Sequence, residues 1–137
     1  MSNPTNLRYT TTHEWAKLDG EVVTVGITQF AVEQLGEPTF LELPAVGKAL
    51  AAGKAFGIIE SVKATSDVNS PVNGTVVERN EVLVDNKASG RKADLMLVND
   101  DPVGKGWMLK IKLAPGATLD HLLTGAQYDA QLASEGH

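Results

Sequence analysis

Short apolar runs, separated by glycine and proline, recur along the first 115 residues of the chain. Five of these runs are rich in β-branched or large apolar residues and are predicted to form strands: residues 21–27, 39–43, 54–62, 74–79 and 107–113. Runs of this length, bounded by turn residues, are typical of an all-β sandwich or barrel. The pattern therefore favours an all-β fold.

The last run has the clearest period of two. Large apolar residues occupy positions 107, 109, 111 and 113, and lysines occupy two of the positions between them. Successive side chains of a strand point to opposite faces. We therefore expect the apolar set on one face, with Met108, Lys110 and Lys112 on the other.

Helical spacing is rarer. Between residues 27 and 35 the apolar side chains recur at helical intervals, with Thr28 as the expected N-cap and Gly36 as the stop. Leu119, Leu122 and Leu123 repeat this spacing until Gly125 interrupts it, and residues 126–134 are expected to resume as a terminal helix. This predicts a C-terminal helical segment of about 117–134.

The composition of the chain excludes several classes of function. The chain has 137 residues, no cysteine, and 12 Lys+Arg against 17 Asp+Glu, for a net charge of -5. This length fits a single domain. Without cysteine there is no disulfide, thiolate nucleophile or iron–sulfur cluster. The acidic balance argues against non-specific nucleic-acid binding, which requires cations for the phosphates.

The sequence also lacks the usual membrane and export signals. No apolar run approaches the ~20 residues of a membrane-spanning helix. Residues 1–6 have neither the charge nor the apolar stretch of a secretory signal. We therefore expect no membrane partner, and a location in the cytoplasm of a bacterium or, for a mature eukaryotic chain, in the mitochondrial matrix.

Candidate catalytic groups are few. The only histidines are His13, His121 and His137, and their spacing suits neither a zinc site nor a triad with a serine. His13 is interpreted as structural. Residues 47–54 (GKALAAGK) resemble a phosphate-binding loop but are one residue too long, and Ala55 stands where a hydroxyl should reach magnesium. The inventory predicts no metal site and a protein that is not an enzyme by itself.

Residues 84–94 (VDNKASGRKAD) depart from the strand pattern. The segment holds five charges and almost nothing apolar, and Lys87, Arg91 and Lys92 make it locally basic. A solvated loop is the expected structure, because loops are polar by default. Docking of an acidic partner on these three cations is the alternative hypothesis.

Residues 57–74 (GIIESVKATSDVNSPVNG) carry the most information. An apolar strand leads to a polar turn and then to a return strand, so we expect a β-hairpin with Lys63 at its tip. Asp67 and Asn69 suit the return because their side chains bond to nearby backbone. A single lysine at such a tip is accessible to a modifying enzyme.

The residues around this lysine resemble the lipoyl-attachment hairpin of the glycine cleavage system H proteins. The hairpin motif Glu-Ser-Val-Lys-Ala-x-Ser-Asp is accompanied, in order, by further matching blocks at residues 9–15, 25–37, 40–57, 70–74, 97–99 and 106–111. Together they cover about residues 7–130. Biotin carriers of related fold instead show Met-Lys-Met, and lipoyl domains of 2-oxo acid dehydrogenases show Asp-Lys-Ala.

This resemblance implies a fold and a role. The fold would be an all-β, lipoyl/biotinyl-type β-sandwich (barrel-sandwich hybrid) with short flanking helices and a C-terminal helix, in one domain spanning residues 1–137 with its core at about 7–115. Lys63 would hold lipoic acid in amide linkage. The carrier would serve glycine catabolism and one-carbon metabolism, and the lipoyl group rather than the protein would supply the reaction.

The resemblance also implies partners and supporting residues. The lipoyl arm would carry an aminomethyl unit from glycine decarboxylase (P protein) to aminomethyltransferase (T protein), and dihydrolipoyl dehydrogenase (L protein) would reoxidise it. Glu14 is the candidate to pair with the ammonium of the loaded arm in a cleft, with Thr12 and Asp67 assisting. Glu60, close to Lys63, is the candidate for recognition by the lipoylating enzyme.

The chain departs from the family pattern at two places, and three competing hypotheses accompany the carrier role. Residues 80–107 form a longer segment than usual, and Val103 follows Pro102 where the family usually has tyrosine. The same motif would also suit a carrier that donates lipoyl groups to other complexes. The second hypothesis is an unlipoylated interaction domain, and the third is a small hydrolase that uses His13.

Overall fold

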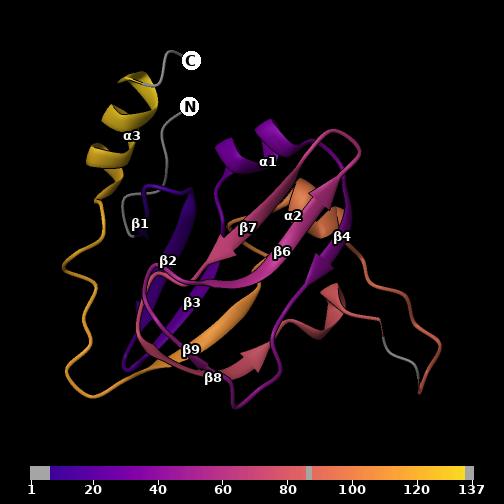
Figure 1. Cartoon of the computed structure of the whole chain (residues 1–137), viewed down its shortest axis with the longest axis horizontal. Helices are drawn as coiled ribbons and strands as arrows, with labels where there is room; N and C mark the ends of the chain where they lie inside the picture. The colour runs from indigo at the N-terminus through magenta and orange to yellow at the C-terminus, as the bar shows by residue number, and fades with distance from the viewer. Residues whose placement is uncertain (1–6, 86–87, 135–137) are drawn as a thin grey trace.

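The fold consists of two antiparallel β-sheets packed face to face, with short helices around them (Figure 1). The structure, a computed structural model, describes residues 7–85 and 88–134. One sheet has six strands in the order β1-β2-β3-β9-β8-β5, and the other has three in the order β4-β6-β7. The predicted all-β sandwich is confirmed.

The six-stranded sheet draws its strands from the whole length of the chain. Its strands are β1 (Arg8–Tyr9), β2 (Glu14–Asp19), β3 (Val22–Ile27), β5 (Ala49–Leu50), β8 (Gly74–Arg79) and β9 (Leu109–Leu113). The three-stranded sheet comes from the middle and comprises β4 (Pro38–Glu42), β6 (Ala55–Ser61) and β7 (Thr65–Asn69). The helical elements are α1 (Gln29–Leu35), η1 (Glu81–Leu83), α2 (Met96–Asp100) and α3 (Gly125–Ser134).

The main core lies between the two sheets. In the large sheet Val23 pairs with Ile111, which pairs with Val76, and all three side chains are buried. From the small sheet, Ile59 and Val68 join the same apolar cluster. The residues on either side of these positions along each strand are half-buried or exposed, as a sheet with one buried face requires.

A second apolar cluster attaches α3 to the outside of the large sheet. It contains Leu7, Tyr9, Trp15 and Tyr128, with partly buried residues packed around them. The Tyr9 and Tyr128 rings stack with centroids 4.6 Å apart. Val103, which departs from the family pattern, packs against this cluster.

The sequence pattern located the main strands and the first helix correctly. The runs predicted at 21–27, 39–43, 54–62 and 74–79 correspond to β3, β4, β6 and β8. The Thr28 hydroxyl accepts a hydrogen bond from the Ala31 N–H and so caps α1, and Gly36 ends the helix at φ 78°. Both predicted capping residues are therefore confirmed.

The prediction for the last strand was only partly right. Leu109 and Ile111 are buried and Lys112 is exposed, as expected, but Met108 is also fully buried. The regular strand begins only at Leu109, so strict alternation does not apply to Met108. Its N–H still bonds to the Val25 carbonyl at 2.7 Å.

The predicted helical segment at 117–124, which included His121, was wrong. This stretch is a series of turns, and α3 begins only at Gly125. Leu119 and Leu122 reach the main core from these turns, while Leu123 pairs with Tyr9 as an isolated β-bridge. The three leucines therefore have helical spacing in the sequence although they lie in turns.

Thr124 explains where the terminal helix starts. Its hydroxyl accepts from the Gln127 N–H, and the Gln127 side chain accepts from the Thr124 N–H. This reciprocal pair is a capping box. Gly125 is therefore the first residue of the helix rather than its interruption.

The basic segment at 84–94 is anchored on one side. Arg91 donates to the carbonyls of Glu81 and Val82, and the Asp94 N–H donates to the Val82 carbonyl. Lys87 lies outside the described residues. Of the three cations in the docking hypothesis, Arg91 is therefore already engaged with backbone.

Candidate functional site

The hairpin formed by β6 and β7 presents Lys63 at its tip, as the sequence predicted. The turn is closed at its base, because the Ser61 N–H donates to the Ala64 carbonyl at 2.8 Å and the Ala64 N–H donates to the Ser61 hydroxyl at 3.1 Å. Val62 and Lys63 stand outside this closure, and both side chains are exposed. A short closed turn of this kind holds the lysine backbone in place and leaves its side chain in solvent.

Gly36, at the end of α1, lies beside the lysine side chain. A Cβ built on Gly36 would be 3.2 Å from Lys63 Cε, and the Gly36 φ of 78° is a conformation that side-chain-bearing residues seldom adopt. Glycine therefore serves two purposes here. It ends the helix and leaves room for the lysine.

A pocket opens next to the hairpin tip. We call this cavity of about 330 Å³ the hairpin pocket. Its walls come from three segments, the loop before β2, helix α1 and the start of β7: Thr12, His13, Phe30, Ala31, Gln34, Leu35, Ala64, Thr65 and Ser66. The lining combines apolar side chains with hydroxyl and amide groups, which suits a flexible chain that carries a polar end.

Glu14 lies under this region and is only 1% exposed. Its carboxylate accepts hydrogen bonds from the hydroxyls of Thr10 and Thr12 and, at 3.1 Å, from the Asn69 N–H. We call these four residues the Glu14 cluster. The cluster joins the loop before β2 to the end of β7, so it ties the large sheet to the hairpin.

Burial dominates the ionisation of Glu14. Removal of the carboxylate from water raises its pKa above the usual value, and the hydrogen bonds from Thr10, Thr12 and Asn69 oppose this shift without cancelling it. The group is therefore a buried acid whose anion is held by hydrogen-bond donors rather than by a cation.

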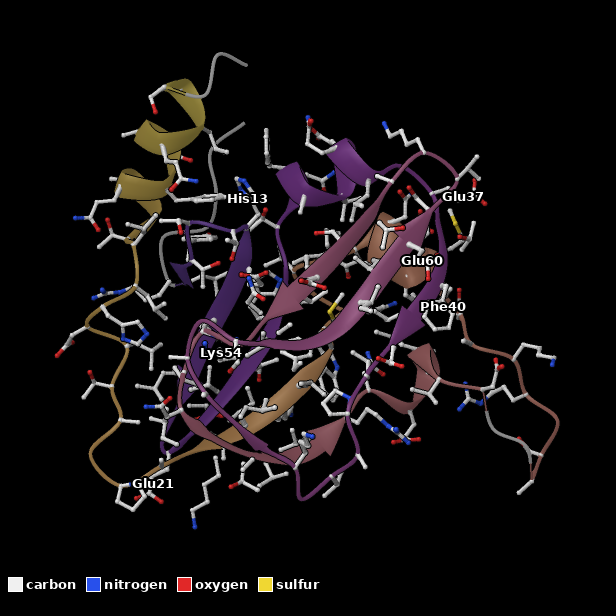
Figure 2. All side chains as sticks on the ribbon, viewed as in Figure 1. His13, Glu21, Glu37, Phe40, Lys54 and Glu60 are labelled. Carbon is white, nitrogen blue, oxygen red and sulfur yellow. The ribbon has the colours of Figure 1, made fainter. Side chains whose placement is uncertain are left out.

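The remaining residues predicted from the sequence lie elsewhere. Glu60 pairs with Phe40 and Thr65, and Asp67 pairs with Ile58, so both acids lie on the outer face of the three-stranded sheet. Figure 2 shows Glu60 beside Phe40. In the described part of the chain the Asp67 carboxylate makes no hydrogen bond with Glu14 or Thr12. The structure thus joins Thr12 to Glu14 and separates both from Asp67 and Glu60.

No pattern in the sequence indicated a second group of hydrogen-bonded side chains, which connects His13 to the start of α1. Tyr128 of α3 places its hydroxyl 2.7 Å from His13 Nδ1 and 2.7 Å from the Thr28 hydroxyl. We call these three side chains the hydroxyl relay. At least a hundred residues separate Tyr128 from Thr28 and His13, so no local motif could have revealed it.

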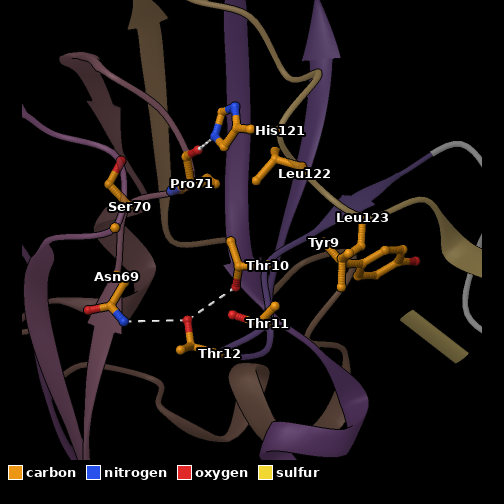
Figure 3. Close-up of a pocket in the computed structure, with 11 residues that line it drawn as sticks. Tyr9, Thr10, Thr11, Thr12, Asn69, Ser70, Pro71, His121, Leu122 and Leu123 are labelled. Atoms are coloured by element: carbon orange, nitrogen blue, oxygen red, sulfur yellow. Dashed lines mark hydrogen bonds between the residues drawn. The ribbon is translucent and has the colours of Figure 1, made fainter. Parts of the chain in front are cut away.

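A further cavity, of about 320 Å³, lies on the other side of Thr12 (Figure 3). Thr10, Thr12, Asn69 and His121 are among its lining residues. His121 Nε2 donates to the Pro71 carbonyl at 2.6 Å, and the Asn69 amide donates to the Thr12 hydroxyl at 3.4 Å. Thr12 is therefore the partition between the two cavities.

The described residues contain no cluster of three or more His, Asp or Glu side chains that could hold a metal ion. None of the described helices has the length and apolar character needed to cross a membrane.

Comparison with known proteins gives one consistent result. Residues 7–135 match the family model for the glycine cleavage H-protein. The glycine cleavage system H proteins of Trichormus variabilis and Nitratidesulfovibrio vulgaris are each 48% identical to this chain, the first over 96% of this chain and 95% of the relative, the second over the full length of both. The crystal structure of a glycine cleavage system H protein from Mycobacterium marinum superposes with a TM-score of 0.80 at 35% identity, covering 96% of this chain and 99% of that one.

Proposed function

The chain belongs to the glycine cleavage H-protein family, the lipoyl carriers of the glycine cleavage system, and we propose that Lys63 is the residue that holds the lipoyl group. The protein is a carrier component of that system and not an enzyme. The observation that carries the proposal is the exposed Lys63 at the tip of a closed hairpin. The amide linkage would remove the lysine charge and lengthen the side chain.

The surroundings of Lys63 fit such a group. Gly36 leaves space beside Cε that a side chain would fill. The hairpin pocket begins at Ala64, directly after the lysine. A long arm attached to Lys63 would therefore have both free solvent and an adjacent cavity within reach.

The lipoyl group, when bound, supplies a disulfide that accepts the aminomethyl unit and is afterwards regenerated by oxidation. The residues of this chain provide presentation and shelter. The hairpin holds the attachment point at the turn between β6 and β7, at one end of the small sheet. The hairpin pocket offers a partly apolar site beside the attachment point. Tethering raises the local concentration of the arm at each enzyme it visits.

We further propose that Glu14 stabilises the ammonium end of a loaded arm. The carboxylate is already surrounded by donors, so a cation would approach from the Thr12 side, where the threonine is exposed and borders the hairpin pocket. An ammonium donor would replace the uncharged Thr12 hydroxyl as the partner of the carboxylate, so both groups of the contact would carry charge. Asp67 is exposed on the outer face of β7 and does not line the hairpin pocket, so its proposed assistance would be limited to an arm that lies outside the pocket.

Glu60 is proposed as a recognition residue for the lipoylating enzyme. It is half-buried on β6, three residues before the lysine, and its partners across the sheet are Phe40 and Thr65. Its position on a strand fixes its distance from the tip. A docking enzyme could therefore use this acid to align Lys63.

The partners follow from the family role. We propose that the carrier serves glycine decarboxylase, aminomethyltransferase and dihydrolipoyl dehydrogenase, in addition to the lipoylating enzyme. The relatives described above are bacterial proteins. We accordingly propose the bacterial cytoplasm as the site of action.

Intact mass and peptide mapping test the attachment site. The purified chain is incubated with a lipoylating enzyme, lipoate and ATP, and we expect one lipoyl addition on the peptide that contains Lys63. Lys54→Arg is the matched control, because Lys54 is also exposed and stands just before β6 of the same hairpin. Addition at Lys54 or elsewhere, with Lys63 unmodified, would refute the assignment.

A further inference from the structure

We propose that Tyr128 is a positioning residue of the carrier: its hydroxyl joins two walls of the hairpin pocket and fixes His13 as the neutral form with its hydrogen on Nε2. The role toward the arm rests on the proposed attachment at Lys63. The hydrogen-bond chain does not depend on that attachment, because all of its members are residues of the unmodified protein.

The relay connects separate segments of the pocket wall. His13 lines the hairpin pocket from the loop before β2. Thr28 caps α1, which supplies the adjoining wall: Phe30, Ala31, Gln34 and Leu35. The Tyr128 hydroxyl lies 2.7 Å from a polar atom of each, so one group from α3 bridges the two walls. A backbone bond from the Thr28 N–H to the His13 carbonyl, at 3.0 Å, lies beside this bridge.

His13 needs such support because its backbone is strained. Among the described non-glycine residues it is the one with positive φ, at 76°. Side-chain-bearing residues seldom adopt this conformation, and they keep it where surrounding contacts demand it. The imidazole packs against two rings. Its centroid is 4.6 Å from that of Phe30 and 5.7 Å from that of Tyr128, which it meets edge-on.

The directions of the hydrogen bonds follow from Thr28. This residue is fully buried, and its hydroxyl oxygen already accepts from the Ala31 N–H. Its hydrogen must therefore go to the Tyr128 oxygen, since a buried hydroxyl hydrogen without an acceptor is costly. The Tyr128 hydrogen then goes to His13 Nδ1. A proton on Nδ1 would instead require the Tyr128 oxygen to accept from both His13 and Thr28, and the Tyr128 hydrogen would then leave the relay.

This arrangement gives α3 a defined role in the carrier. The helix is held by the Tyr9–Tyr128 stack and by the Gln131 amide, which donates to the Thr11 carbonyl at 3.0 Å. Tyr128 transmits that docking to the pocket through a single hydroxyl. The walls around a loaded arm would consequently depend on a helix that does not line the pocket.

The first test measures the His13 tautomer in unlipoylated protein by imidazole ¹⁵N chemical shifts. We expect an unprotonated Nδ1 and a protonated Nε2 in the wild type and in Thr28→Ser, which keeps the hydroxyl. Tyr128→Phe should shift the Nδ1 signal, because the donor to that atom is gone. A protonated Nδ1 in the wild type at neutral pH, or an unchanged spectrum in Tyr128→Phe, would overturn the proposal.

The second test measures shelter of the arm. The lipoylated carrier is loaded with the aminomethyl unit, and its spontaneous loss is followed with no transferase present; each loss consumes one water, restores a thiol and yields formaldehyde and ammonium. We expect Tyr128→Phe to accelerate the loss about three- to tenfold, the factor that corresponds to one hydrogen bond. Tyr9→Phe, which alters the same stacked pair outside the relay, should stay near the wild-type rate.

An equal acceleration in Tyr9→Phe would show that the faster loss comes from weaker docking of α3 and not from the missing Tyr128 hydroxyl. That result would overturn the positioning role. An unchanged rate in Tyr128→Phe would do the same. If Lys63 accepts no lipoyl group, the proposed function fails, while the tautomer measurement still decides the relay.

Discussion

Between Val62 and Asp67 every side chain is exposed, whereas Glu14, under the same hairpin, is 1% exposed and accepts hydrogen bonds from three donors. The tip consists of one continuous segment closed by local bonds. The Glu14 cluster is assembled from two segments more than fifty residues apart in sequence. The residue proposed to carry cargo is thus free to move, while the residue proposed to stabilise it is held in place.

This difference assigns stability and attachment to different residues. Changes at the tip should alter modification with little effect on folding. Changes in the Glu14 cluster should alter folding and ionisation while leaving the attachment residue intact. The variants below test that separation, starting with the largest expected effect.

Lys63→Arg should abolish lipoylation completely, because a guanidinium cannot form the amide. The unfolding free energy should change by less than about 0.5 kcal/mol, as for most exposed positions. Intact mass and urea denaturation measure the two quantities. A lipoylated Lys63→Arg chain would show that the attachment point lies elsewhere. A large loss of stability would show that the tip residue contributes to folding as well as to attachment.

Gly57→Ala should destabilise the base of the hairpin. A Cβ on Gly57 would overlap the Glu42 carbonyl oxygen, so β4 and β6 must move apart. We expect a loss of about 3 kcal/mol in unfolding free energy, measured by urea denaturation. Gly53→Ala is the control. Its Cβ meets nothing within 4 Å, and its φ of 81° should cost about 1–2 kcal/mol.

Thr10→Val should destabilise the Glu14 cluster by about 1–3 kcal/mol, because the buried carboxylate loses a donor. The same hydroxyl also accepts from the Glu14 N–H at 3.0 Å. Thr11→Val, at the neighbouring exposed residue, should stay within about 0.5 kcal/mol of the wild type. Equal effects in the two variants would show that the carboxylate does not depend on the Thr10 hydroxyl.

The raised pKa of Glu14 predicts a pH dependence of stability. The folded state binds the Glu14 proton more tightly than the unfolded state, so this contribution is fully present below the ordinary carboxyl pKa of 4.5 and is lost as pH rises through the raised value. Urea midpoints across that range, compared with Glu14→Gln, isolate the contribution. A wild-type midpoint that rises with pH relative to Glu14→Gln would contradict it.

Val62→Ala should have the smallest effect of the set. The Val62 side chain is 92% exposed and contributes almost nothing to the core. Both the urea midpoint and the extent of lipoylation should match the wild type, with any stability change within about 0.5 kcal/mol. A loss of lipoylation would show that the modifying enzyme reads this valine directly.

The same contrast explains what the sequence could predict. The hairpin, its tip and the caps of α1 are local features, so their patterns identified the tip position of Lys63 and the capping roles of Thr28 and Gly36 correctly. The run at 119–123 was misread because its leucines serve a turn and two clusters at once. The Glu14 cluster and the hydroxyl relay depend on contacts between distant segments, and no spacing within one segment encodes them.

The position of Tyr128 in the last helix has a consequence for biosynthesis. A nascent chain emerges from the ribosome N-terminus first, so the β6–β7 hairpin and its lysine become available before α3 exists. An enzyme that reads only the hairpin would accept such an unfinished chain, and translation that stops after β9 would yield a polypeptide that can be lipoylated but lacks the third member of the relay. If Lys63 and Tyr128 have the proposed roles, completion of the last helix would separate a carrier that can be lipoylated from one that can also shelter its cargo.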